Sequence, residues 1–116
     1  MNAQFKKGVL ELCVLTLISR KDYYGYELVE EISKVLEISE GTLYPILRRL
    51  TDEKYFETYL RESSEGPPRK YYRITKAGKD FQKDQFKQWA EFNKQIEKLI
   101  GGKTNESTRL FTLAKS

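Results

Sequence analysis

The fold of this chain is decided by residues 39–50, which read Ser39-Glu40-Gly41-Thr42-Leu43-Tyr44-Pro45-Ile46-Leu47-Arg48-Arg49-Leu50. Apolar residues spaced i, i+3, i+4 and i+7 predict a helix that buries one stripe, namely Leu43, Ile46, Leu47 and Leu50. Ser39 or Thr42 can cap its start. Because proline lacks the amide that a helix interior needs, Pro45 fits best in a first turn. We therefore expect the ordered helix to begin near Gly41–Thr42.

Two helices are expected before this stretch. The first runs from Phe5 to Ser19, and its apolar face is wide enough to pack against more than one neighbour. That face holds Phe5, Val9, Leu12, Cys13 and Thr16, with Leu10, Val14, Leu17 and Ile18 on its flank. Tyr24-Gly25-Tyr26 opens the second helix, whose core stripe is Leu28, Val29 and Ile32. The short connection at Val35–Ile38 predicts that the second and third helices meet through a tight turn.

A β-hairpin is expected after the third helix, because the apolar period changes from 3.6 to 2. Its strands are Tyr55–Arg61 and Arg69–Thr75, the second with Tyr72 and Ile74 on one face. Glu62–Pro68 between them has the composition of a loop. The order helix, helix, helix, hairpin is typical of a winged helix-turn-helix, so the fold class is mainly α with a small β-hairpin (α+β).

A long last helix is predicted from the Thr75–Gly78 cap to about Ile100, where Gly101-Gly102 ends it. Its near-heptad seam consists of Phe86, Trp89, Phe92, Ile96 and Leu99. A domain this small cannot cover a helix this long, which favours a homodimer over packing within one chain. The first helix would join that interface through Phe5, Val9 and Leu12. The expected divisions are 1–75 for the winged helix, 76–102 for the dimerisation helix and 103–116 for a tail.

Composition narrows the class of protein. The chain has 116 residues, a net charge of +4, one cysteine and no histidine. Without histidine the commonest general base and metal ligand are missing, and no nucleotide loop or nucleophile motif is present, so we expect neither an enzyme nor a metal or other cofactor. The lone Cys13 cannot form an internal disulfide, and no apolar run is long enough to cross a bilayer, which favours a cytoplasmic protein without a membrane partner.

Three motifs together resemble the PadR family of transcriptional regulators. They are Tyr24-Gly25-Tyr26-Glu27-Leu28, the stretch Ser39–Leu50 and Gly66-Pro67-Pro68-Arg69-Lys70-Tyr71-Tyr72-Arg73-Ile74-Thr75-Lys76-Ala77-Gly78. The resemblance covers about Leu10 to Gly78 and, more loosely, the long helix. It implies a homodimeric repressor that binds a palindromic operator in double-stranded DNA and is released by small molecules. Phe86 and Trp89 also resemble the small multidrug-sensor-like branch, in which a tryptophan of this helix stacks on planar aromatic effectors.

The resemblance assigns candidate DNA contacts to the winged helix. On the third helix the face opposite the buried stripe would enter the major groove, with Ser39, Thr42, Tyr44, Pro45 and Arg48 as its leading residues. Arg69 and Lys70 are candidate wing contacts to the DNA backbone or minor groove, although a solvated hairpin would carry the same charges. Tyr24 is either a phosphate contact or a core residue. Trp89 is either a site for a planar aromatic or phenolic effector or part of the dimer core.

One position departs from the family pattern, and one rival function stays open. The family often places glycine before the first wing strand, where a helix C-terminus favours positive φ, but here that residue is Lys54. The wing angle could therefore differ. The rival is a winged helix that binds another protein through the Glu-rich second helix, without specific DNA binding.

Overall fold

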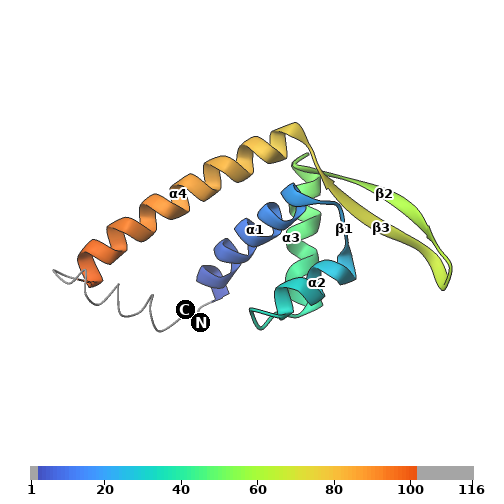
Figure 1. Cartoon of the computed structure of the whole chain (residues 1–116), viewed down its shortest axis with the longest axis horizontal. Helices are drawn as coiled ribbons and strands as arrows, with labels where there is room; N and C mark the ends of the chain where they lie inside the picture. The colour runs from blue at the N-terminus through green and yellow to red at the C-terminus, as the bar shows by residue number, and fades with distance from the viewer. Residues whose placement is uncertain (1–2, 102–116) are drawn as a thin grey trace. The chain divides into compact units, whose positions relative to one another are not determined.

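The computed structural model describes residues 3–101, with side chains from Gly8 onward. The elements of the described residues, in chain order, are α1 (Ala3–Arg20), β1 (Tyr23–Tyr24), α2 (Gly25–Ser33), α3 (Glu40–Asp52), β2 (Phe56–Ser63), β3 (Gly66–Ile74) and α4 (Lys76–Ile100). Among the described residues, those up to Lys83 belong to one compact unit and those from Asp84 onward to a second. The first unit is a winged helix-turn-helix, in which β2 and β3 project from the three helices as the wing (Figure 1). The predicted fold class is confirmed.

The core of the first unit is apolar and draws on every element from α1 to β3. Its buried side chains are Leu10, Val14, Leu15, Ile18, Tyr23, Leu28, Ile32, Leu43, Ile46, Leu47, Leu50, Phe56, Tyr72 and Ile74. All members of the stripe predicted on α3 are buried there. The helix therefore turns its opposite face outward, as its spacing predicts.

The predicted main face of α1 is wrong. Leu10, Val14 and Ile18, which were expected on the flank, are fully buried together with Leu15. Val9, Leu12, Cys13 and Thr16 are only half-buried, and the side chain of Phe5 lies outside the described residues. The helix packs against α2, α3 and β3, so contacts far along the chain select the buried side of a helix that is apolar on most sides.

The start of α3 also differs from the expectation. The helix begins at Glu40, and the carbonyl of Ser39 accepts hydrogen bonds from the amides of Thr42 (3.1 Å) and Leu43 (3.2 Å). Pro45 therefore lies in the second turn, where it supplies no amide to the carbonyl of Gly41. Gly41 and Pro45 are both exposed, which leaves that carbonyl accessible to solvent at little cost.

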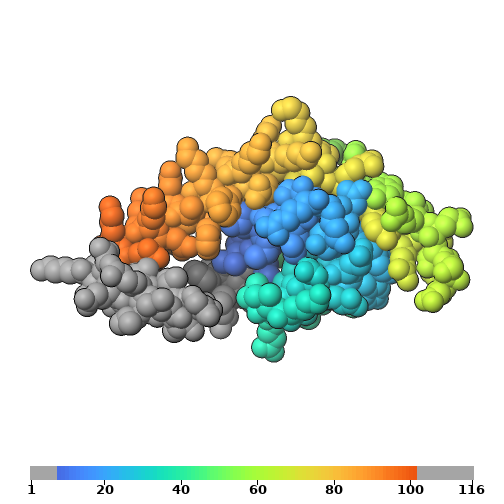
Figure 2. All heavy atoms as spheres, viewed as in Figure 1, coloured from blue at the N-terminus to red at the C-terminus, as the bar shows by residue number. Residues whose placement is uncertain are grey.

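The wing is longer than predicted, because the ladder continues into the expected loop. Ser63 pairs with Gly66, so only Ser64 and Glu65 form the turn. The next pair is Arg61 with Arg69, which sets Pro67 and Pro68 against the single residue Glu62 in a β-bulge. Prolines are compatible with a strand at such a point, since the bulge removes the ladder hydrogen bonds that they cannot donate. Figure 2 shows the end of the wing extending beyond the helices of the first unit.

The short strand β1 was not expected from the sequence. Tyr23 pairs with Tyr72 and Tyr24 with Tyr71, giving an antiparallel sheet in the order β1-β3-β2. Tyr23 and Tyr72 face the core, while Tyr24 and Tyr71 lie on the outer face of the sheet. The residues just before α2 are thereby attached to the base of the wing.

The exit from α3 shows how the chain manages without the expected glycine. Lys54 has a φ of 69°, the left-handed conformation that glycine adopts more easily. Its amide donates to the carbonyl of Thr51 (3.0 Å), and the amide of Tyr55 donates to that of Leu50 (2.9 Å). These two bonds form a Schellman motif. The helix therefore ends with the backbone geometry that glycine favours, with lysine in the left-handed position.

The base of the wing is joined to the start of α4 by Thr75. Its hydroxyl donates toward the carbonyls of Lys54 (2.8 Å) and Tyr55 (3.1 Å) and accepts from the amide of Gly78 (3.0 Å). The predicted cap of α4 is thus confirmed, and the same side chain bonds the connection between α3 and β2 to the start of α4. A Cβ on Gly78 would overlap the carbonyl oxygen of Tyr55, so only glycine fits this crossing.

Candidate nucleic-acid interface

The outward face of α3 presents polar and cationic groups. Thr42, Pro45 and Arg48 are exposed, and Tyr44 is half-buried at the border of the core. Ser39 lies exposed at the N-cap, where its hydroxyl is 3.2 Å from that of Thr42. A helix N-terminus with hydroxyl groups around it offers donors and a positive dipole end to anions.

The two arginines of α3 have different partners. Arg49 forms ion pairs with Glu11 of α1 and with Glu53 (3.1 Å), and hydrogen bonding to Glu11 raises its pKa. Arg48 forms no hydrogen bond or ion pair with any residue between Gly8 and Gly101 and is exposed. Arg49 therefore fastens α3 to α1, whereas the guanidinium of Arg48 is available to a ligand.

Tyr44 is held at this surface by the glycine that opens α2. A Cβ on Gly25 would lie 2.8 Å from the phenol oxygen of Tyr44 and 3.0 Å from its Cε1, so the ring rests directly on the backbone of α2. Burial, with a further contribution from the Glu40 carboxylate, raises the pKa of Tyr44. The phenol stays protonated at neutral pH and can donate a hydrogen bond to a phosphate or a base.

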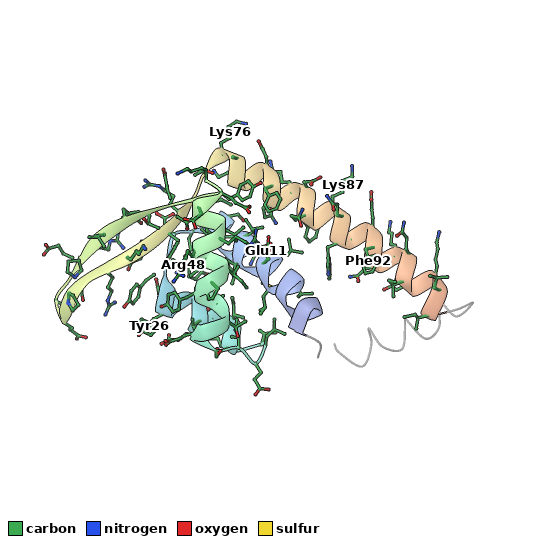
Figure 3. The ribbon with its side chains drawn as sticks, turned by 180° about the vertical axis from the view of Figure 1, so that it is seen from behind. Glu11, Tyr26, Arg48, Lys76, Lys87 and Phe92 are labelled. Atoms are coloured by element: carbon green, nitrogen blue, oxygen red, sulfur yellow. The ribbon has the colours of Figure 1, made fainter. Side chains whose placement is uncertain are left out.

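A pocket of about 350 Å³ lies between α3 and the wing. Its lining residues are Tyr44, Arg48, Thr51, Asp52, Lys70 and Tyr72. Arg48 from α3 and Lys70 from β3 bring two positive charges to it, and Asp52 brings one negative charge. Figure 3 shows Arg48 on α3 with the hairpin beside it. The pocket therefore combines an excess of positive charge with hydroxyl donors, which suits an anion such as a phosphodiester.

The two wing residues singled out by the sequence lie on opposite faces of β3. The ammonium of Lys70 lies 5.8 Å from the centroid of the Tyr72 ring and lines the pocket with Arg48. The guanidinium of Arg69 lies 5.0 Å from the centroid of the Tyr24 ring on the outer face. Tyr24 is half-buried, and its amide donates to Glu27 (3.0 Å) at the start of α2. Lys70 thus joins the surface of α3, whereas Arg69 and Tyr24 belong to the other side of the wing.

Several features of this interface are not predicted by the sequence. Thr51 and Tyr72 were not expected beside Arg48, although Thr51 follows Arg48 at the i+3 spacing of one helix face. Asp52 belongs to the outward face of α3 that the spacing predicts. The spacing of residues could not predict the contact between Gly25 and Tyr44, because it joins two different helices. The expected core position of Cys13 is corrected to a half-buried one, where partial burial raises its thiol pKa.

The second unit carries the seam predicted on α4. Phe86, Trp89, Phe92 and Leu99 are exposed, with 42% of Trp89 accessible, and Ile96 is half-buried. The Phe86 and Trp89 rings lie 6.1 Å apart between centroids. Because these side chains recur about one helical turn apart, they form a continuous apolar stripe, which is unusual on the surface of a monomer. Within the described part of the chain no helix could span a membrane and no acidic, cysteine or histidine group could hold a metal ion.

Comparisons with known proteins agree with this geometry. Residues 14–84 match the profile described as the transcriptional regulator PadR-like family. An uncharacterized protein from Lysinibacillus sphaericus is 40% identical over 100 residues, which cover 83% of this chain and 92% of that protein.

Solved structures extend the likeness to the whole fold. A PadR-like transcriptional regulator from Bacillus cereus is similar with a TM-score of 0.77 and 40% identity, over 86% of this chain and 99% of that one. A PadR family transcriptional regulator from Eggerthella lenta is similar with a TM-score of 0.76 and 31% identity, over 88% of each chain. The residues 14–84 that match the family profile include α3 and β3, which line the pocket.

Proposed function

Because this chain belongs to the PadR-like family of transcriptional regulators, and is thus a DNA-binding regulator and not an enzyme, we propose that it is a ligand-responsive homodimeric repressor of a palindromic operator. The observation that carries the proposal is the meeting of Arg48 and Lys70 at one pocket between α3 and the wing. In a winged helix the third helix enters the major groove, so the DNA backbone beside that groove runs between helix and wing. Because a regulator of transcription must reach the DNA, we place the protein in the cytoplasm.

Each residue of the interface takes a defined part in this proposal. Ser39, Thr42, Tyr44 and Pro45 face the bases and phosphates at the N-terminal end of α3. Arg48 pairs with a guanine edge or a phosphate, and Lys70 neutralises a phosphate from the wing. Tyr24 supports Arg69 on the outer face, where both lie near the flanking backbone.

The dimer part of the proposal rests on the exposed stripe of α4. Phe86, Trp89, Phe92, Ile96 and Leu99 would be covered by a second copy, together with Val9 and Leu12 of α1 and with Phe5. Two copies would present two α3 helices to half-sites about one helical turn, ~34 Å, apart, which requires a palindromic operator. We therefore propose that residues 1–75 bind DNA, that residues 76–102 form the dimer and that residues 103–116 are a tail. The tail lies outside the described residues.

The ligand part of the proposal rests on Trp89. Its indole is 42% exposed beside Phe86, so a planar aromatic or phenolic compound has a flat face on which to stack. Such a compound would bind at the dimer interface and release the operator. Titrating planar aromatic drugs and phenolic acids against Trp89 fluorescence tests this role, because Trp89 is the only tryptophan of the chain. Fluorescence that no compound quenches would leave Trp89 as a dimer-core residue.

Footprinting of the purified protein on the DNA upstream of its own gene tests the central proposal. Protection of a palindrome, lost in an Arg48→Gln variant and kept in an Arg20→Gln variant, is the expected result. Arg20 is an exposed arginine at the end of α1 and serves as the charge-matched control. Absence of binding at low salt would favour the rival, a protein-interaction module whose contact surface is the exposed glutamates of α2, Glu30 and Glu31.

A further inference from the structure

The outer face of the wing carries two like charges directly opposite each other. Arg61 of β2 and Arg69 of β3 are register partners. Side chains in such a pair have Cβ atoms about 4.5–5.5 Å apart, and like charges at that distance destabilise the ladder. Both arginines are exposed, and neither forms an ion pair within the part of the chain whose side chains are described. The direct pairing of the two charges therefore opposes the stability of the ladder.

The same face contains a stabilising pair that serves as a comparison. Glu57 and Arg73, nearer the base of the wing, are also register partners, and their Nε–Oε1 distance is 2.9 Å. Opposite charges thus face each other at the base, and like charges face each other next to the Pro67-Pro68 bulge. A local choice that opposes stability points to a function at that place.

The positions of both guanidiniums are set by aromatic rings beneath them. The Cζ of Arg61 lies 5.0 Å from the centroid of the Tyr71 ring, and the Cζ of Arg69 lies 5.0 Å from that of Tyr24. The two rings are themselves neighbours, with centroids 5.9 Å apart. A neutral ring attracts a cation without cancelling its charge. Two planar groups of hydrogen-bond donors are therefore held side by side, an arrangement that suits the oxygens of a phosphate.

We propose that Arg61 and Arg69 form an anion site for a phosphodiester of the DNA strand that lies across the minor groove from the strand bound by Arg48 and Lys70. This inference rests on the proposed function. Lys70 follows Arg69 directly and so faces the other side of β3, toward the pocket on α3. The minor groove is about 6 Å wide and has a phosphate backbone along each edge. A hairpin with cations on both faces can contact both edges at once.

Salt dependence of binding tests the assignment with the full chain. Fluorescence anisotropy on a labelled duplex of the upstream DNA gives the slope of log K against log salt for the wild type and for Arg61→Gln, Arg69→Gln and Arg73→Gln. Each of the first two is expected to lower the magnitude of the slope by about 0.9 for every phosphate that the variant no longer neutralises. Arg73→Gln is the matched control on the same face, and its slope should equal that of the wild type because Arg73 is paired with Glu57.

Thermal melting separates a binding role from a structural one. Arg61→Gln and Arg69→Gln should change the melting temperature little, because the loss of the contact with the Tyr71 or Tyr24 ring opposes the relief of repulsion between the two guanidiniums. Arg73→Gln should lower it, because an ion pair is broken. A lowered melting temperature with an unchanged salt slope for Arg61→Gln and Arg69→Gln would show that the pair serves only the fold and would overturn the proposal.

Duplexes with single neutral methylphosphonates identify the strand. The wild type should lose affinity when phosphates on either edge of the minor groove are neutralised. The Arg61→Gln/Arg69→Gln double variant should become insensitive to substitutions on one strand, and Lys70→Gln to those on the other. Insensitivity to the same strand in both variants would overturn the two-edge assignment. Failure of the wild type to bind any duplex overturns the proposed function and this inference with it, whereas binding with unaltered slopes overturns the inference alone.

Discussion

The neighbouring arginines of α3 allow binding and stability to be tested by substitutions at adjacent positions. Replacement of Arg48 by glutamine removes an exposed cation that forms no hydrogen bond or ion pair with the described residues, so we expect DNA binding to weaken while the fold is little affected. Replacement of Arg49 breaks its ion pairs with Glu11 and Glu53, so we expect loss of stability with DNA binding retained. The two variants have the same net charge, and general electrostatic attraction to DNA is therefore equal in both.

The magnitudes follow from the surroundings of each side chain. A bidentate arginine contact to a guanine contributes ~1–3 kcal/mol of discrimination per half-site, and a phosphate contact contributes about 0.9 to the salt slope. Arg49 and Glu11 are 37% and 19% exposed, so solvent screens their ion pair only in part. An ion pair of this kind stabilises a fold by ~1 kcal/mol or less. For a domain of this size that amounts to a fall in melting temperature of about 4–8 °C at most.

Anisotropy titrations on the upstream DNA and thermal melts by circular dichroism measure both quantities on the same preparations. The expected pattern is weaker binding with an unchanged melting temperature for Arg48→Gln and the reverse for Arg49→Gln. Equal reductions of affinity in the two variants would refute the reasoning, because they would mean that only total charge matters. A clearly lower melting temperature in Arg48→Gln would likewise mean that this side chain stabilises the fold, although it forms no hydrogen bond or ion pair with the described residues.

Three glycine-related substitutions test the geometry behind the interface. Lys54→Gly should raise the free energy of unfolding by up to ~1 kcal/mol, because it relieves a left-handed backbone conformation; a lower melting temperature would argue against strain at that residue. Gly78→Ala should lower the stability by about 2 kcal/mol or more, since the new Cβ meets the backbone of Tyr55, and a melt like that of the wild type would show that the crossing can open. Gly25→Ala should weaken DNA binding while the melting temperature changes little, because the new methyl group displaces the ring of Tyr44, which is a flexible side chain and not backbone. Unchanged affinity would show that Tyr44 does not contact DNA.

The sequence predicts those helices and strands whose apolar residues fit only one pattern of burial. Helix α3 has a single apolar side, so the burial of Leu43, Ile46, Leu47 and Leu50 could be predicted without the structure. In α1 nearly every side is apolar, and only the contacts with α2, α3 and β3 decide which residues are buried. The strand β1 has two residues, too few to show an alternation. Pairing with β3, which is distant along the chain, creates it.

In the wing, residue spacing predicts only part of the candidate site. Because successive side chains of a strand point to opposite faces, Arg69 and Lys70 lie on different faces of β3. The sequence alone predicts this separation, but it is lost when the two residues are treated as one basic patch. Arg61 and Arg69 flank the expected loop Glu62–Pro68, and a flexible loop of that length would let their side chains diverge. Instead the ladder continues past them to Ser63 and Gly66 and fixes them face to face. Composition cannot reveal this, because Pro67 and Pro68 are typical of a loop until the bulge opposite Glu62 accommodates them. The charge conflict at Arg61 and Arg69 therefore becomes visible only with the register, and only then does it distinguish the wing's outer face from an ordinary solvated surface.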